Sequence, residues 1–211
     1  MSTTFAADAS LDDVIDASGF TVEDAEPQQG GAACSKPGMY HVHVKDAKRE
    51  GSLEPNEKGE FKSPCVRLDL EILAGSESDQ VGKVIYHRIY LAKARRDPSG
   101  KTVGYDPLTD KSREQYMRTA VQLGVMAKED VGKQGAPVRW SQVIGRQAVV
   151  RVDRDEEDDF KDKTKKRVVH RINFGNFWEV HHEDVKDVPK DPEAMAMAGN
   201  GGASEIDLTN L

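Results

Sequence analysis

Apolar and polar residues alternate with a period of two in three segments, at residues 40–45, 66–72 and 84–91. Such alternation is typical of β-strands that bury one face and expose the other. Residues 48–62 separate the first two segments and are polar and rich in turn-forming residues, which predicts a long hairpin loop. We therefore expect three consecutive strands in the first half of the chain.

The period then changes to that of a helix between Asp110 and Gly124, with Asp110 or Ser112 as the expected N-cap. Alternation returns at residues 147–152 and again at 168–174. The highly charged residues between these two segments predict a loop. The second half of the chain is thus expected to contain one helix followed by two strands.

This order of elements decides the fold class. A doubly wound sheet needs repeated alternation of strands and helices, which is missing here. Five strands with one helix between the third and the fourth match a five-stranded Greek-key OB barrel. We predict a mainly β, OB-type fold. A split α+β sheet is the competing architecture, because strand order cannot be read from one sequence.

Charge divides the chain into three parts. The whole chain of 211 residues has a net charge of −7 and is 37% hydrophobic. Residues 1–35 carry −7, residues 187–211 carry −4, and residues 36–186 between them carry +4. Both ends are poor in branched apolar residues, so they cannot bury enough surface to offset the entropy of ordering. We expect an OB-fold domain at 36–186 between two disordered acidic tails.

Several classes of protein are disfavoured by composition. The chain has no run of about 18 apolar residues that would span a membrane. No basic residue precedes the apolar positions of its first 20 residues, unlike in a secretory signal. Two cysteines, Cys34 and Cys65, cannot form a disulfide framework. We expect a cytoplasmic protein with no membrane contact.

The third strand carries the first candidate for chemistry. If its apolar residues face the core, Tyr86, Arg88 and Tyr90 face solvent, two residues apart. Bases can stack on such rings while the guanidinium neutralises a phosphate. The alternative is that these side chains merely cover the sheet.

Basic residues with aromatic neighbours gather in the loops that should flank this strand. In an OB barrel the ligand lies across the second and third strands, between the first and last hairpin loops. The resulting nucleic-acid-binding candidates, beside those of the third strand, are Arg67 on the second strand, Lys48, Arg49, Phe61 and Lys62 in the first loop, Lys93, Arg95 and Arg96 after the third strand, and Phe160, Lys161, Lys163, Lys165, Lys166 and Arg167 in the last loop. Such a set predicts a groove that follows a phosphate backbone, although a solvated charged face has the same composition.

No enzyme motif is present. Clustered carboxylates at residues 153–162 could hold Mg²⁺ for a nuclease, but consecutive carboxylates in a hairpin loop point in different directions. His41 and His43 share a strand face without a third metal ligand at a recognisable spacing. We therefore expect no catalytic residue, no metal and no cofactor.

The chain resembles the phage-encoded OB-fold single-stranded DNA-binding proteins across about residues 36–190. The resemblance lies in the opening strand from Pro37, the segments 66–75 and 84–91, the helix that ends at Leu123-Gly124, the Ile144-Gly145-Arg146 lead, and the closing stretch from Phe174 to Pro189. It implies sequence-tolerant binding of single-stranded DNA in replication or recombination.

The last eight residues, from Ser204, also resemble the acidic, apolar tip with which bacterial single-stranded DNA-binding proteins dock partner enzymes, but they lack its terminal Pro-Phe. Replication or recombination proteins are therefore candidate partners of the C-terminal tail. Three other functions stay open for the chain: an OB-type adaptor that binds proteins, a metal-dependent nuclease as the less favoured alternative, and binding of RNA, since stacking does not distinguish the sugar.

Overall fold

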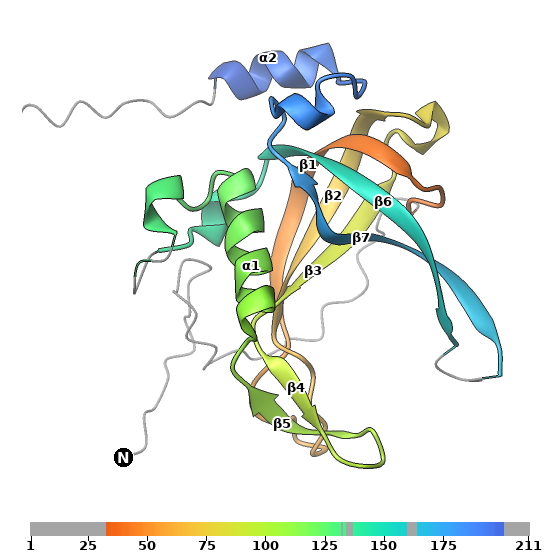
Figure 1. The fold of residues 1–211 in the computed structure, drawn as a ribbon, viewed down its shortest axis with the longest axis vertical. Coiled ribbons are helices and arrows are strands. Elements are labelled where there is room, and N and C mark those ends of the chain that lie inside the picture. The colour runs from red at the N-terminus through yellow and green to blue at the C-terminus, as the bar shows by residue number, and fades with distance from the viewer. Residues whose placement is uncertain (1–32, 132, 134–136, 160–163, 201–211) are drawn as a thin grey trace, which may run out of the picture.

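The protein is described from a computed structural model, which covers residues 33–131, 133, 137–159 and 164–200. Its strands are β1 (Gly38–Glu50), β2 (Cys65–Gly75), β3 (Val84–Tyr90), β4 (Lys93–Arg96), β5 (Thr102–Asp106), β6 (Gln147–Asp158) and β7 (Lys166–Trp178). Its α-helices are α1 (Asp110–Gln122) and α2 (Pro192–Asn200). The fold is mainly β, as predicted (Figure 1).

Five strands form one antiparallel sheet in the order β3-β2-β1-β6-β7. The central strand β1 pairs with β2 from Tyr40 to Glu50 and with β6 from Gly38 to His43. The edge strands β3 and β7 meet at the rings of His87 and Phe177, whose centroids are 6.0 Å apart. No hydrogen-bonded ladder joins β3 to β7 in the described residues, so the sheet is open along this seam.

The core lies inside the curve of the five-stranded sheet and consists of the apolar faces of its strands. Val42, Leu70 and Ile89 belong to one continuous cluster with Tyr116 and Ala120 of α1. The helix thus covers one end of the sheet (Figure 1). Full burial of a side chain such as Val42, Leu70 or Ile89 contributes about 1.5–3 kcal/mol to the free energy of folding.

Helix α1 lies where the pattern predicts it, but its cap differs. Thr109, rather than Asp110 or Ser112, is the N-cap, and its side chain accepts a hydrogen bond from the Ser112 N–H. Gly124 follows the helix at φ +65°, a left-handed conformation that favours glycine. No helix in the described part of the chain is long and apolar enough to cross a membrane.

Several strands are longer than predicted. Strand β1 continues to Glu50, and β6 and β7 extend through most of the segment that was predicted to be a charged loop. That part of the prediction is wrong because opposite charges face each other across the two strands, as at Glu157↔Arg167. The β4–β5 hairpin was not predicted. It turns at Asp97, whose Oδ1 accepts hydrogen bonds from the N–H groups of Ser99 and Lys101.

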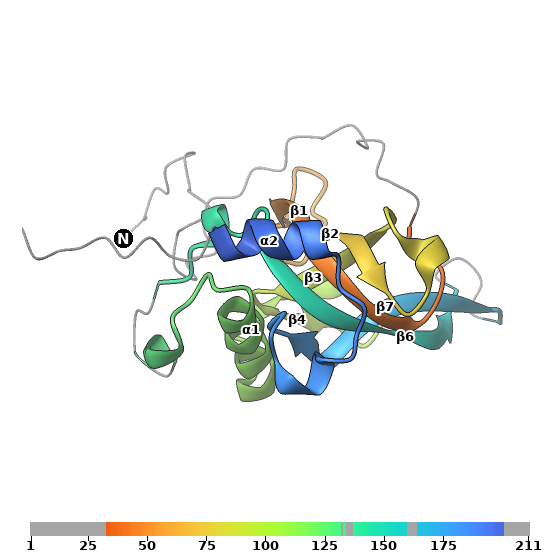
Figure 2. The same cartoon turned by 90° about the horizontal axis from the view of Figure 1, so that it is seen from above.

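The predicted boundaries of the tails also need correction. At the N-terminal side, Ala33 forms a bridge with Val84 of β3, so the described chain joins the sheet before residue 36. At the C-terminal side, residues 187–200 contain α2, which lies beside the sheet (Figure 2). Fully buried His41 explains this: its Nδ1 accepts a hydrogen bond from the Asp191 N–H, and its Nε2 bonds Gln147 Oε1. Residues 1–32 and 201–211 lie outside the described residues.

Candidate functional site

The outward face of β3 has the arrangement that the alternation predicts. Ile85, His87 and Ile89 are buried, whereas the side chains between them are exposed. Tyr86 is 40% exposed and Tyr90 is 52% exposed, with the Arg88 side chain between them at 47%. We call Tyr86, Arg88 and Tyr90 the aromatic row.

A cluster of charges lies beside the aromatic row and ties three strands together. Arg67 of β2 donates from Nε and Nη2 to the two carboxylate oxygens of Asp69, at 2.7 and 2.8 Å. Its Nη1 donates to Glu50 Oε1 at 2.9 Å, and its Cζ lies 5.2 Å from the ring centroid of Tyr86. Arg88 Nε donates to the other oxygen of Glu50, at 3.2 Å.

The electrostatics of the cluster favour the charged forms. Burial opposes the ionisation of Glu50, but the hydrogen bonds from Arg67 and Arg88 outweigh it and hold the pKa of this carboxyl below its usual value. For Arg67, the hydrogen bonds from its guanidinium to Asp69 are the largest influence and raise its pKa. Glu50 and Asp69 together balance the charge of the two arginines.

The terminal guanidinium nitrogens of Arg88 are less engaged than those of Arg67. Its Nη1 and Nη2 make no hydrogen bond to any residue that the structure describes. Three nitrogens of Arg67, in contrast, are engaged by carboxylates. Arg88 therefore presents a guanidinium edge to solvent between two exposed rings, and Arg67 does not.

The candidates of the first hairpin fall into three groups. Lys48 lies on the outward side, opposite Arg67, and pairs with Asp46 at 3.0 Å. Arg49 lies opposite buried Val66, and its Nε and Nη1 are shielded from solvent, so it does not belong to this face. Phe61 packs edge-on against Tyr105 of β5 at 5.7 Å between ring centroids, and Lys62 is exposed.

The β4–β5 hairpin continues the chain directly from the aromatic row. Lys93, Arg95 and Arg96 are exposed on β4. Arg95 lies 3.6 Å from Asp106, and Arg96 donates to the carbonyl of Gly100. Because Phe61 packs on Tyr105, the hairpin and the first loop lie against each other below the sheet (Figure 1).

The last hairpin extends away from the body of the protein as a distal arm, which we define as residues 153–158 of β6 and 166–171 of β7 (Figures 1 and 2). Its cations pair with carboxylates of the same arm: Arg171 with Asp155 at 2.6 Å, Arg167 with Glu157 at 2.6 Å, and Lys166 with Asp158. Lys165 is exposed next to this ladder. Phe160, Lys161 and Lys163 lie outside the described residues.

The structure therefore brings together only part of the predicted set. The aromatic row, Arg67 and Lys48 share one outward face, and Lys93, Arg95 and Arg96 follow it along the chain. Sequence reasoning missed Glu50 and Asp69, which hold the arginines. For Asp69 the signal was its place among the polar positions of the second predicted strand, whereas Glu50 lay in the predicted loop and gave no such signal.

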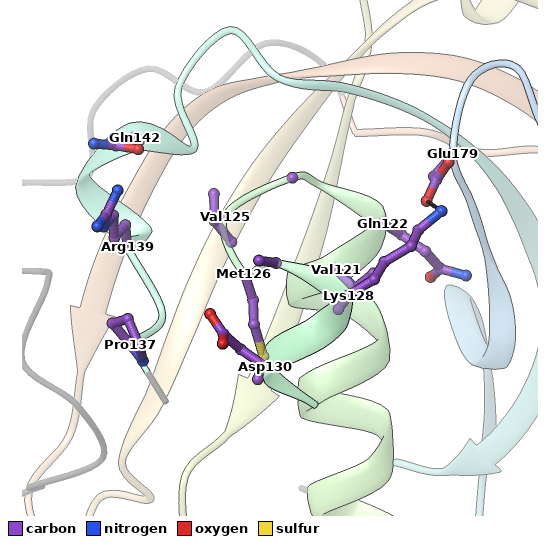
Figure 3. A pocket seen from close by; sticks show the side chains of 12 residues that line it. Val121, Gln122, Val125, Met126, Lys128, Asp130, Pro137, Arg139, Gln142 and Glu179 are labelled. Atoms are coloured by element: carbon purple, nitrogen blue, oxygen red, sulfur yellow. Dashed lines mark ion pairs between the residues drawn. The ribbon is translucent and has the colours of Figure 1, made fainter. Parts of the chain in front are cut away.

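A separate cleft of about 540 Å³ lies at the C-terminal end of α1. Its lining includes Val125, Met126 and Arg139, with the Lys128–Glu179 ion pair of 2.7 Å beside it (Figure 3). None of the predicted site residues lines it. In the part of the chain that the structure describes, His, Cys, Asp and Glu side chains form no group of three that could hold a metal ion.

Comparison with known proteins gives no match, either to a protein-family model or to a curated protein.

Proposed function

We propose that this protein binds single-stranded DNA without sequence preference, through an OB-type sheet. The observation that carries the proposal is the aromatic row, in which the open edge of Arg88 lies between two exposed tyrosines on one strand. Stacking serves any base, and the guanidinium serves any phosphate, so the row suits a ligand recognised by its backbone and rings.

The strand order supports the OB assignment. Strand β1 pairs with both β2 and β6, and α1 lies between β3 and β6 in the chain. An OB fold is a partly open five-stranded barrel that binds across its second and third strands, which here are β2 and β3. The aromatic row is on the outer of these two strands.

The spacing of the row favours a single strand over a duplex. Tyr86 and Tyr90 are four residues apart along a strand, or about 13 Å. Bases of a duplex rise by about 3.4 Å per step and are stacked on each other, so their faces are closed to protein rings. Bases on both tyrosines would have to belong to an extended, unstacked chain.

The arrangement of cations favours a path from the aromatic row towards the β4–β5 hairpin. The cations of the distal arm are held by neighbouring carboxylates, whereas Lys62 and Lys93 make no ion pair among the described residues. The expected role of such binding is to coat single strands during replication or recombination, as in the phage proteins that the sequence resembles.

The test is a titration with labelled oligo-dT, oligo-U and duplex at several salt concentrations. We expect binding to oligo-dT that weakens with salt, with a log–log slope of about −0.7 per phosphate contacted. Tyr86→Ala and Tyr90→Ala should each weaken it about 5- to 150-fold, because a stacked base contributes about 1–3 kcal/mol. Exposed Ile144 offers the control Ile144→Ala, which should bind normally. Equal affinity for duplex, or no salt-sensitive binding, would refute the proposal.

A further inference from the structure

Arg67 and Arg88 lie directly opposite each other on β2 and β3. Like charges in this position repel and destabilise a strand pair. Glu50, at the end of β1, accepts hydrogen bonds from both guanidinium groups and has a side chain only 16% exposed. One carboxylate thus fixes the distance and orientation between two cations of neighbouring strands.

The two arginines differ in what remains open. Asp69 and Glu50 together engage Arg67 through Nε, Nη1 and Nη2, and its guanidinium lies over the Tyr86 ring. Arg88 is held through Nε alone, and its two terminal nitrogens make no hydrogen bond to the residues that the structure describes. A guanidinium held at Nε is pre-organised to donate two parallel hydrogen bonds from its other edge.

We propose that Glu50 is a positioning residue that orients Arg88 to bind a phosphodiester group of the single strand, between the bases stacked on Tyr86 and Tyr90. Arg67 then has a structural role: it supports the Tyr86 ring and anchors Glu50, and it does not contact phosphate. This inference rests on the proposed function and assigns separate roles to residues that share one face.

The proposal makes a prediction opposite in sign to that of simple charge repulsion. A carboxylate close to bound DNA repels phosphate, so its removal should tighten binding if charge alone matters. If Glu50 positions Arg88, its removal should weaken binding, because Arg88 becomes free to adopt many rotamers that must be ordered again when DNA binds. The sign of the effect therefore separates the two explanations.

The experiment compares Glu50→Gln with Glu71→Gln in oligo-dT titrations from low to moderate salt. Glu71 is a matched control on β2, since its partners are His43 and Lys45 rather than Arg67 and Arg88. We expect Glu50→Gln to bind about 5-fold or more weakly and to lose about 0.7 from the salt slope, the value for one phosphate. Glu71→Gln should bind as well as the unmodified protein or slightly more tightly.

Tighter binding by Glu50→Gln with an unchanged slope would overturn the proposal. If near-ultraviolet circular dichroism shows that Glu50→Gln does not fold, Arg88→Lys decides instead, because it keeps the charge and removes the two-pronged edge. We expect it to bind at least about 5-fold more weakly, and unchanged affinity would refute the role of Arg88. Absence of binding by the unmodified protein would refute the proposed function itself, which is a separate outcome.

Discussion

His41 links the sheet to the C-terminal segment, and His41→Leu tests the strength of that link. Leucine has a similar volume, so the change leaves little cavity. It does remove the acceptor of the Asp191 N–H, 3.1 Å away, and the partner of Gln147 Oε1, 3.0 Å away. Each polar group left unsatisfied in a buried setting costs about 1–3 kcal/mol. Two groups lose their partner, and Gln147 is only half-buried. We therefore expect the free energy of unfolding to fall by about 2–4 kcal/mol in total, the lower part of the range for two groups.

The assay is urea unfolding followed by tryptophan fluorescence. With a slope of about 2 kcal/mol per molar urea, the midpoint should fall by about 1–2 M. His43→Leu is the control: it lies two residues away on the same strand face, but it is half-exposed and bonds Glu71 at the surface. Its midpoint should fall by less than about 0.5 M. Limited proteolysis of His41→Leu should also release fragments cut between residues 187 and 196. Equal shifts for the two variants would refute the assignment of this network.

Three further predictions concern stability. Tyr116→Phe should lower the free energy of unfolding in urea by about 1–3 kcal/mol, because the buried Trp140 Nε1–H, which donates to the Tyr116 hydroxyl at 2.9 Å, loses its acceptor. The control Tyr105→Phe removes a buried hydroxyl that has no partner among the described residues, so it should cost less than about 0.5 kcal/mol. Equal costs for the two variants would contradict the reasoning. Burial lowers the pKa of His87 to about 4, so the unfolded chain binds more protons between about pH 4 and 6.5. The free energy of unfolding should therefore fall by about 3 kcal/mol as the pH is lowered from about 6.5 to 4. The urea midpoint of His87→Leu should fall correspondingly less over the same pH range. Arg171→Gln breaks exposed ion pairs of the distal arm, so it should speed amide exchange in residues 153–158 while lowering global stability by less than about 1 kcal/mol; slower exchange there would refute the role of the ladder.

The sequence predicts the strands that bury one face, because a period of two is visible in each of them. Ile85, His87 and Ile89 face the core and Tyr86, Arg88 and Tyr90 face solvent, as the alternation requires. The prediction fails where strands leave the core. Residues 153–158 have no buried face of their own, and charge pairing with β7 holds them extended instead. Such pairing becomes visible only when the register between the two strands is known.

The candidate site was predictable in its residue types but not in their roles. Arg49 and Arg67 look alike in the sequence, yet a bulge in β1 between Val44 and Asp46 shifts which positions of that strand face the core. Arg49 consequently lies opposite a buried valine, while Glu50 comes to face the arginines. A one-residue change of register exchanges the two faces of a strand. The periodicity of the sequence alone does not show where such a bulge occurs.

The bond between Asp191 and His41 also has a consequence for the order of synthesis. These residues are 150 positions apart, and β1 is the central strand of the sheet. At about 5–20 residues per second, the partner of His41 is made roughly 8–30 s after His41 itself. During that interval a growing chain can pair β1 with β2, and β2 with β3, but the His41 imidazole and the neighbouring apolar side chain of Met39 still lack the C-terminal segment that covers them. The nascent protein therefore exposes for several seconds a surface that the finished protein buries under its own C-terminal segment.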